Sequence, residues 1–462
     1  MLFHSFEFLL VFLPITWVGY VLLRRHLPLR YGLGWLTAAS LLFLGWHEPS
    51  FLFLMLAAIL ANYSCARLLM AARTQRYRQA LFWTGIVLNV GYLGYFKYSA
   101  WAVGTANHLF DLNQAVPQVV LPLAISFYTF EQITYLVDVY RGRALKATLL
   151  EYTLFLSFFP QLIAGPILHH HEILPALRRH QLRISRTQIA VGISMFAIGI
   201  FKKVVLADRL DRYFDRGYEV VIGGITPTFF DAWCMMTCAA MHIYMDYSAY
   251  ADMAVGLGLL FGIRLPLNFY SPFKATTVAE FWRRWNLTLM RFLREHIYVP
   301  LGGNRRGFGR QSIAVLVTMI LCGLWHGAGW NCVLWGGVVG LILVAELVLR
   351  PRWEVLARGA PWFRRVFGRA VVFVCFVLPL TIFMFPDTTI GLSVIASMVG
   401  AEGVVLPERT LGWLGPLGAA LQGAGVQFKT PLAVYFGVNQ LILLAVTLFV
   451  VYACPNTHQL FG

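Results

Sequence analysis

The sequence has 462 residues, of which 59% are hydrophobic and only 13% are charged, and its formal net charge is +16. Soluble globular proteins carry about a quarter charged residues, so this composition excludes a water-facing surface and predicts a chain solvated by lipid. The apolar runs are continuous rather than short and alternating, which excludes a β-barrel and predicts an all-α polytopic membrane protein.

The first apolar run, FLLVFLPITWVGYVLL, covers residues 8–23. It follows His4 and Glu7 rather than a basic segment, and no small-residue cleavage site follows it, so we expect a retained helix and no cleaved signal peptide. Along the rest of the chain the basic residues gather in segments between apolar runs, as the positive-inside rule describes. We therefore interpret the net charge as membrane topology and expect no nucleic-acid partner.

The basic segments divide the chain into cytoplasmic and outside parts. We assign to the cytoplasm the segments at 24–30, 67–78, 141–143, 178–186, 264–310 and 350–369. The N-terminus and the weakly charged loop at about 386–430 are then outside. With about 20 residues per span, the chain holds roughly 10–12 membrane segments, some of them re-entrant or interfacial, such as the Pro- and Gly-broken run at 156–168. No internal repeat is visible, so we predict a single domain over 1–462.

Two carboxylates lie in an otherwise apolar run, DYSAYADM, at Asp246 and Asp252. Six residues of spacing puts them on different sides of a helix. Each fits two roles equally well: pairing or capping of helices, and contact with a substrate.

Two groups of residues raise the question of a metal. The seven cysteines follow no metal-ligand spacing, and we expect all of them to be structural. Three adjacent histidines stand at His169–His171, but neighbouring side chains point in different directions. We expect these histidines to lie in a loop, and no metal site.

The segment AEFWRRWNLTLMRFLREHIYVPLGGNRRG, at 279–307, begins with the pattern of an amphipathic helix. The helix is followed by PLGGNRRG, at 300–307, whose glycines permit a tight turn. At helical spacing the aromatic residues and leucines share one side, and the arginines share the other: Phe281, Trp282, Trp285, Leu289, Phe292 and Leu293 against Arg283, Arg284, Arg291 and Arg294. The simplest interpretation is an interfacial helix with its aromatic side in lipid. Asn286 stands at the margin of the aromatic side, where a carboxamide is costly unless it is paired or solvated, and it could instead meet a substrate carbonyl.

The segment CGLWHGAGW, at 322–330, places His326 inside a long apolar run. A core histidine bonded to another helix is the structural interpretation. Ionisable groups within a membrane are more often functional, and three nearby glycines leave room for a ligand or for close backbone approach. We expect a neutral imidazole that can act as a base.

Taken together in this order, five segments resemble one family: LPLAISFYTFEQITYLVDVYRG, FFPQLIAGPIL, YMDYSAYADMAVGLGLLFGIRLPLNFYSPF, EFWRRWNLTLMRFLREHIYVPLGGNRRG and CGLWHGAGW. The chain resembles the membrane-bound O-acyltransferase superfamily, above all its bacterial alginate O-acetylation branch. The teichoic-acid D-alanyl transfer proteins are more distant relatives. The likeness covers most of the chain and places a catalytic core at about 121–349.

The resemblance implies a multi-helix fold with a central tunnel. It implies that His326 is the catalytic base and that Asn286 is the family's second polar position. Many alginate-type members carry histidine at that second position, and many bacterial relatives also carry histidine where this chain has Val339.

The coenzyme and wall residues follow from the same picture. We expect the phosphates of coenzyme A to meet four arginines: Arg283, Arg284, Arg305 and Arg306. Three tryptophans are expected to line the pocket: Trp282, Trp285 and Trp325. Asp246 and Asp252 are further candidates for contact with the substrate.

The implied function is the transfer of an acetyl group from cytoplasmic acetyl-CoA, across the bacterial inner membrane, for O-acetylation of an exopolysaccharide such as alginate or cellulose. The implied partners are membrane lipid, an extracytoplasmic acetyltransferase, a polysaccharide synthase or secretion complex, and the polysaccharide acceptor. Two alternatives stay open. One is acyl or D-alanyl transfer from a carrier protein to an envelope polymer. The other is a transporter of an acyl or glycan precursor, which would favour inverted repeats that this sequence does not show.

Overall fold

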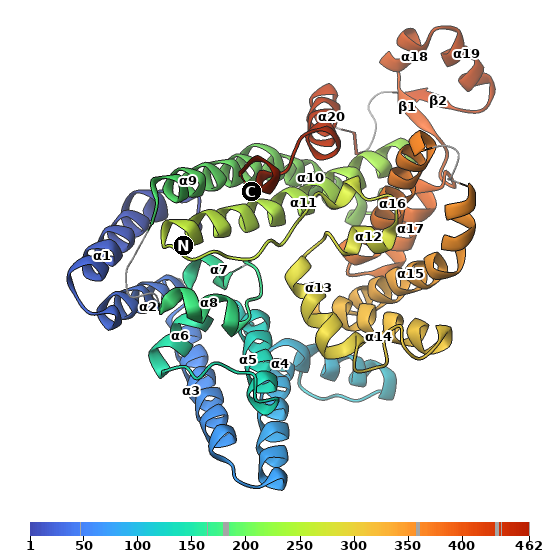
Figure 1. Ribbon diagram of the computed structural model, residues 1–462. Coiled ribbons are helices and arrows are strands. Elements are labelled where there is room, and N and C mark those ends of the chain that lie inside the picture. Colours follow the sequence, from blue (N-terminus) through green and yellow to red (C-terminus); the bar gives the residue numbers. More distant parts are fainter. Residues whose placement is uncertain are drawn as a thin grey trace. The chain divides into compact units, whose positions relative to one another are not determined.

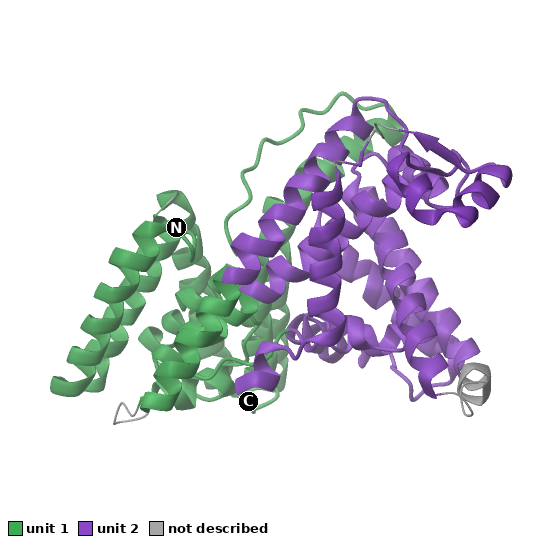
Figure 2. Cartoon of the chain, turned by 90° about the horizontal axis from the view of Figure 1, so that it is seen from above, with its two compact units in different colours: residues 1–200, 250–268 green, residues 201–249, 269–462 purple. Residues whose placement is uncertain are grey.

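The computed structural model describes residues 1–462 apart from 47, 164, 179–183, 357–360, 430–433, 436 and 462, and gives no side-chain description at 351–356. The described part is almost wholly helical, with one short two-stranded sheet (Figure 1). It forms two compact units, residues 1–200 with 250–268, and residues 201–249 with 269–462 (Figure 2). The boundary at Ala249 falls inside helix α11 (Phe229–Leu260), and the single domain over 1–462 stays a prediction.

Unit 1 contains the N-terminal helices and the end of α11. Its elements are the π-helical η1 (Glu7–Phe12), α1 (Leu13–His26), α2 (Leu29–Gly45), α3 (Pro49–Ala71), α4 (Gln75–Phe110), α5 (Ile125–Tyr140), α6 (Leu149–Ser157), α7 (Phe159–Leu162), α8 (His170–Leu177) and most of α9 (Arg186–Phe201). Helix starts follow local signals. The Thr74 hydroxyl accepts the N–H of Tyr77 at the start of α4, and Thr148 and Glu151 form a capping box on α6.

Phenylalanine rings form the centre of unit 1. The rings of Phe8, Phe12, Phe43 and Phe159 all lie within 5.2 to 6.0 Å of one another, centroid to centroid. These are normal separations for packed aromatic pairs. The predicted broken segment at 156–168 supplies part of this core, because α6 ends at Ser157 and a single turn, α7, follows the buried Phe158.

A buried carboxamide cluster joins α3, α4 and α5. The Asn62 amide donates to Gln132 Oε1 at 2.9 Å, and the Asn89 amide donates to Asn62 Oδ1 at 2.6 Å. All three side chains are less than 10% exposed. Polar groups in an apolar environment are costly unless paired, so this cluster fixes the relative register of three helices.

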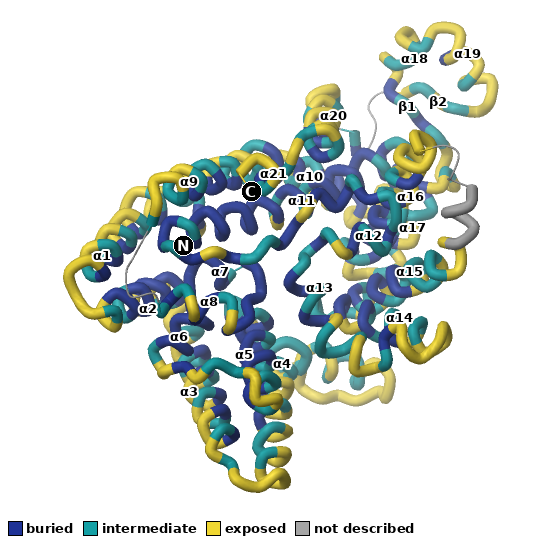
Figure 3. The backbone as a smooth tube through the Cα atoms, in the orientation of Figure 1, coloured by how far each residue is buried: buried dark blue, intermediate teal, exposed yellow. Residues whose placement is uncertain are grey.

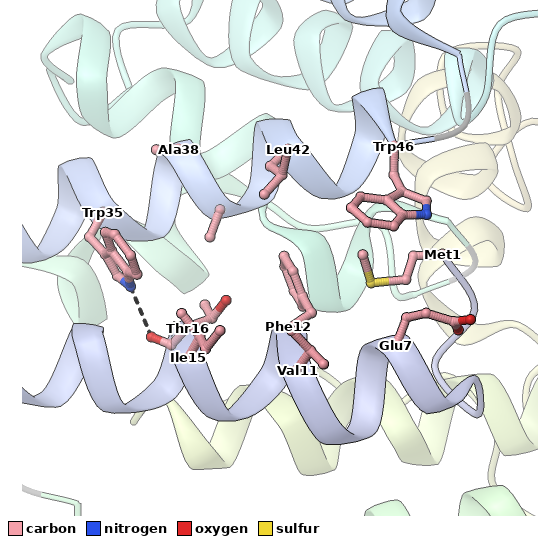
Figure 4. Close-up of a pocket in the computed structure, with 11 residues that line it drawn as sticks. Met1, Glu7, Val11, Phe12, Ile15, Thr16, Trp35, Ala38, Leu42 and Trp46 are labelled. Carbon is pink, nitrogen blue, oxygen red and sulfur yellow. Dashed lines mark hydrogen bonds between the residues drawn. The ribbon is translucent and has the colours of Figure 1, made fainter.

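An apolar crevice of about 390 Å³ opens between α2 and the η1–α1 helix (Figure 4). Figure 4 shows Trp35 at one end, where its indole N–H donates to the Thr16 carbonyl at 3.0 Å, and Trp46 towards the other end. The lining is otherwise almost entirely hydrocarbon, which suits a surface solvated by lipid.

An ion pair ties α8 back to the start of α6. Arg178 donates to both carboxylate oxygens of Glu151, at 2.7 and 3.0 Å. Burial favours the neutral form of Glu151, but the hydrogen bonds and charge of Arg178, together with the bonds from Thr148, outweigh burial and hold the pKa of Glu151 below its usual value of 4.5.

This pair predicts a pH-dependent loss of stability. A carboxylate with a lowered pKa stabilises the fold fully above its unfolded-state pKa, and that contribution is lost as the pH falls through the folded-state pKa. We expect Glu151→Gln to lower the free energy of unfolding at pH 7 by about 1 kcal/mol, because Arg178 is partly exposed. Thermal unfolding in detergent from pH 7 to below pH 4.5 should show the difference from wild type shrinking with acid. A difference that stays constant over this range would remove the ion pair as its cause.

Unit 2 contains the end of α9, most of α11 and the C-terminal helices. Its elements are the π-helical η2 (Lys202–Ala207), α10 (Asp208–Ile222), the 3₁₀ turn η3 (Pro272–Lys274), α12 (Val278–Trp282), α13 (Leu287–Leu293), the π-helical η4 (Arg294–Tyr298), α14 (Phe308–His326), α15 (Trp330–Leu356), α16 (Pro361–Met384), α17 (Thr388–Met398), β1 (Val405–Pro407), α18 (Arg409–Leu414), α19 (Pro416–Gly423), β2 (Gln427–Lys429), α20 (Val438–Ala453) and α21 (Thr457–Phe461). Helix α11 is buried along most of its length (Figure 3).

The predicted outside loop at 386–430 is ordered secondary structure over its described part, which ends at Lys429. It contains α17, α18 and α19, and β1 pairs in parallel with β2. The outside location of this segment stays a prediction, and the segment carries its own apolar contacts. Val394 and Met398 of α17 are buried, and the Trp233 indole N–H donates to the Met398 carbonyl at 2.9 Å.

Six of the described helices are long and apolar enough to cross a membrane: Glu7–His26, Pro49–Ala71, Arg186–Ile222, Phe308–His326, Trp330–Arg350 and Pro361–Met384. Thr388–Met398 and Val438–Ala453 are shorter apolar helices. The all-α polytopic prediction is confirmed. The count of 10–12 segments, their topology and the central tunnel stay predictions. Residues 179–183 and 357–360, from two of the basic segments, lie outside the described residues.

Candidate active site

His326 is the last residue of α14 and is half-buried. Three rings surround its imidazole at edge-on angles: Trp325 at 4.6 Å, Trp335 at 5.3 Å and Phe383 at 5.6 Å, centroid to centroid. They come from α14, α15 and α16. The histidine is therefore held at a helix end in an aromatic setting, but it is not sealed from a ligand.

The aromatic cluster extends from the histidine to α12. Trp335 packs against Trp282 at 5.8 Å, and Trp282 lies 6.5 Å from Trp285. Trp285 in turn lies 5.9 Å from Tyr244 of α11. The structure thus brings the predicted site residues Trp282, Trp285, Trp325 and His326 into one continuous set of ring contacts.

Glycines allow α14 and α15 to touch backbone to backbone. A Cβ added at Gly323 would lie 2.1 Å from the Cys332 carbonyl oxygen, and one at Gly336 would lie 2.3 Å from the Met319 carbonyl oxygen. The sequence left open whether the glycines near His326 make room for a ligand or for a backbone. At Gly323 the room is taken by α15, as in close small-residue helix packing.

The neighbouring glycines of α15 provide a matched test of this contact. We expect Gly336→Ala to lower the free energy of unfolding by about 1–3 kcal/mol, because the added methyl group forces the two helices apart. A Cβ at Gly337 meets nothing within 4 Å, so Gly337→Ala should leave stability unchanged or slightly raised. Thermal unfolding of both purified variants decides the point. Equal melting temperatures would show that α14 and α15 do not need this approach.

The segment at 279–299 is not the one continuous helix that the sequence predicted. It forms α12, a turn at 283–286, α13 and the π-helical η4. The break has a local cause, since Asn286 adopts a left-handed conformation with φ 41° and ψ 58°, which no α-helix accommodates. The Arg284 carbonyl also accepts the N–H of Tyr270 at 2.9 Å, instead of an N–H of the next helical turn.

The aromatic side of this segment packs on protein, which corrects the interpretation that places it in lipid. Phe281, Trp282 and Trp285 are at most 6% exposed. Phe281 and Trp285 lie 5.0 and 5.1 Å from the ring of Phe376 in α16. The periodicity identified the buried side correctly, and the partner of that side is α16 and α15.

Asn286 is the half-buried N-cap residue directly before α13, and its side chain makes no capping hydrogen bond. Asparagine often caps a helix with its side-chain oxygen. At this position the carboxamide is left for another partner, such as a carbonyl oxygen. Asparagine also tolerates the left-handed conformation better than most residues.

The four predicted arginines lie in different environments. Arg283 is exposed in the turn before Asn286, while Arg284 pairs with Glu280 at 2.6 Å. Arg305 and Arg306 are exposed in the turn after η4, where positive φ angles at Gly302 and Gly303 confirm the predicted tight turn.

The two aspartates of the apolar run, Asp246 and Asp252, belong to different units. Asp246, in unit 2, pairs with Lys203 of η2 at 2.6 Å, and Lys203 also reaches Asp208 at 2.9 Å. That contact supplies the partner that a helix-pairing role requires. Asp252 is buried in unit 1. The substrate role of either residue stays a prediction.

The three adjacent histidines stand at the start of α8 rather than in a loop. The Glu172 carboxylate accepts the His169 N–H at 2.8 Å and closes a capping box. Among the described residues, Asp138, His170 and His171 lie close enough to hold an ion together. However, His170 Nε2 accepts the Leu145 N–H at 3.1 Å, and Nδ1 lies 3.5 Å from Asp138. Nε2 is thus engaged by the backbone, as in a structural role, while Nδ1 faces Asp138 without a hydrogen bond.

Sequence reasoning missed Trp335 and Phe383, which complete the surroundings of His326. Trp335 stands in the same apolar run as the histidine, and its position beside two glycines was the available signal. Phe383 belongs to α16, where the Asn331 amide of α15 donates to its carbonyl at 2.9 Å. The sequence carries no local signal for a contact between residues as far apart as His326 and Phe383.

Comparison with known proteins gives a consistent result. The family model of membrane-bound O-acyltransferases matches residues 146–386. The chain is similar to a peptidoglycan O-acetyltransferase of Helicobacter pylori, with 34% identity over 88% of this chain and 81% of that protein. It is also similar to a protein of Azotobacter vinelandii named probable alginate O-acetylase, with 38% identity over 76% of this chain and 69% of that protein. A teichoic acid D-alanyltransferase of Streptococcus thermophilus is 26% identical over 48% of this chain and 56% of that protein.

Proposed function

Because the chain belongs to the membrane-bound O-acyltransferase family, we propose that it takes an acetyl group from cytoplasmic acetyl-CoA and passes it across the membrane for O-acetylation of an envelope or extracellular polysaccharide. Membership makes the chain an O-acyltransferase and a multi-pass membrane protein. The observation that carries the proposal is the half-buried His326 at the end of α14, inside the ring cluster of Trp325, Trp335 and Phe383.

The proposed chemistry is direct transfer from a thioester to a hydroxyl. The hydroxyl oxygen attacks the thioester carbonyl carbon, a C–O bond forms and the C–S bond breaks. His326 takes the proton of the hydroxyl as a general base and returns it to the departing sulfur, which leaves as the thiol of coenzyme A. Asn286 donates a hydrogen bond to the carbonyl oxygen as negative charge gathers there.

The remaining predicted residues fit supporting roles. Trp325 and Trp335 beside His326, and Trp282 on α12, would reduce the water around the reacting atoms. A lower local dielectric would strengthen the hydrogen bond of Asn286 to the carbonyl oxygen. The exposed Arg283, Arg305 and Arg306 are available to the phosphates of coenzyme A. Arg284 is held by Glu280, so we give it the weaker role of shaping the turn that contains Asn286.

The acceptor is proposed from two of the relatives, the peptidoglycan O-acetyltransferase and the probable alginate O-acetylase. Peptidoglycan and alginate are polymers that carry hydroxyl groups outside the cytoplasm. An acetyl donor on one side and an acceptor on the other require transfer through the protein. We propose that an extracytoplasmic acetyltransferase partner receives the group before the polysaccharide does.

The similarity to teichoic acid D-alanyltransferases supports a second candidate, transfer of an acyl or D-alanyl group from a carrier protein. The same exposed arginines would suit the acidic surface of a carrier. The base and the carbonyl donor would keep their roles, since the donor is again a thioester.

The test uses the full chain in nanodiscs with radiolabelled acetyl-CoA, alone and with a polysaccharide acceptor fraction. Release of free coenzyme A that depends on His326 supports the proposal. Turnover only with an acylated carrier protein favours the second candidate. Wild-type protein inactive with either donor, in the presence of membranes that supply the partner, would contradict both.

A further inference from the structure

A groove of about 350 Å³ lies between α15, α16 and residues 276–278, all within unit 2. Its lining is mainly apolar, with one carboxylate and one guanidinium among the side chains: Thr276, Thr277, Val278, Ile342, Ala345, Glu346, Leu349, Arg350, Phe367, Gly368, Val371 and Cys375. No residue placed in the acyl-transfer chemistry lines it. A pocket of this size is in the range of small-ligand sites.

The groove exists because α16 approaches the chain before α12 closely at one point. A Cβ added at Gly368 would lie 2.7 Å from the Thr276 carbonyl oxygen. Gly368 thus brings α16 against the chain before α12, while the lining residues Leu349 and Phe367 stay 54% and 46% exposed. Two large apolar side chains thus stand at an open groove rather than filling it.

Both walls are membrane helices. The candidate spans Trp330–Arg350 and Pro361–Met384 supply all the lining outside 276–278, so the solvent in front of the groove is lipid. The groove lies towards the end of α15 and the start of α16, and three of its lining residues, Arg350, Phe367 and Gly368, belong to the basic segment at 350–369. By the positive-inside rule this is the cytoplasmic side of the membrane.

The two charged residues are arranged in order along α15. Glu346 Oε2 accepts the Ala279 N–H at 3.0 Å, at the start of α12. Arg350 follows one helical turn later, towards the basic end of the span, and is exposed. The carboxylate is thus engaged with α12, and the exposed Arg350 lines the groove beside it. Basic pockets between membrane helices on the cytoplasmic side favour anionic headgroups.

We propose that this groove binds an anionic phospholipid of the cytoplasmic leaflet, with an acyl chain along the apolar lining and the phosphate at Arg350. The occupant follows from the combination of features: a hydrocarbon lining, an opening towards lipid and a cation at the headgroup end. A neutral lipid fits only the first two. Because Glu346 joins the groove to α12, which carries Trp282, an occupied groove supports the helix that leads into the aromatic cluster.

Binding is measured on the full chain in detergent by native mass spectrometry, with phosphatidylglycerol and phosphatidylcholine added separately. Wild type should bind one phosphatidylglycerol at least tenfold more tightly than phosphatidylcholine. Ala345→Phe fills the groove and should abolish that binding. Val348→Phe places the same ring on an exposed part of α15 that does not line the groove, and should bind as wild type. These readouts are independent of the acyl transfer proposed above.

The role of the Arg350 charge is tested separately from the role of the groove volume. Arg350→Gln should retain lipid binding but lose most of the preference for phosphatidylglycerol. If Ala345→Phe fails to fold, as judged by gel filtration and melting temperature, Val371→Phe blocks the groove from the α16 wall instead. Undiminished phosphatidylglycerol binding in a folded groove-filling variant would overturn the site. Equal wild-type affinity for the two lipids would overturn the anionic occupant.

Discussion

His326→Gln should lower acyl transfer by about 10²- to 10⁴-fold, which is the usual contribution of general base catalysis. Glutamine has a similar reach and can donate or accept a hydrogen bond, but it cannot take up a proton at neutral pH. The ring contacts of His326 with Trp325, Trp335 and Phe383 are partly replaced by the glutamine side chain, so the fold should remain. Turnover of radiolabelled acetyl-CoA in nanodiscs, with a matched melting temperature, measures the effect.

His296→Gln is the control for this experiment. His296 is another half-buried histidine of unit 2, and its Nδ1 lies 3.0 Å from the Phe292 carbonyl, one turn back in its own segment. A glutamine can make the same local bond, so transfer should stay near wild type. If His326→Gln is folded and also transfers at the wild-type rate, His326 is a packing residue and the proposed mechanism fails.

Asn286→Asp and Asn286→Gly should each lower transfer by about 10²- to 10³-fold, the effect of losing one donor to a developing oxyanion. The two variants separate the side chain from the backbone. Asparagine adopts φ 41° at this position, and aspartate and glycine both tolerate that conformation. Aspartate preserves the shape but removes the amide donor, and glycine removes the side chain altogether.

Asn286→Ala is the informative contrast. Alanine removes the donor and is also strained at positive φ, so it should lose stability as well as transfer activity. The rate constant is compared with the melting temperature for all three variants. Wild-type transfer by Asn286→Gly would show that the position serves only to break the helix, and would remove the carbonyl-donor role.

The sequence predicted the membrane class and the helical content because long apolar runs have few alternative structures in lipid. It also placed the aromatic side of the 279–307 segment correctly on one face. It failed at Asn286, where a left-handed residue interrupts the helix. A periodic pattern continues through such a break, since residues on either side stay in phase.

The surroundings of His326 were only half predictable. Trp325 is adjacent in sequence, and Trp282 and Trp285 belong to a segment that was already singled out. Trp335 and Phe383 depend on how α15 and α16 pack against α14, which is set by glycine contacts such as Gly336 on the Met319 carbonyl. The contact of Met398 with Trp233 was unpredictable for a similar reason, because the low charge of the segment after residue 386 indicated only a side of the membrane.

The backbone contact between α14 and α15 has a consequence for how new specificities arise. Two helices that touch without intervening side chains behave as one stiff hairpin, and His326 stands at its tip. Mutational change on the outward faces of that hairpin leaves His326 where it is. Replacement of Trp335 or Phe383 by smaller residues would then enlarge the space beside a fixed imidazole. If His326 is the base that we propose, a lineage could exchange short acyl groups for longer ones while its proton transfer is inherited intact.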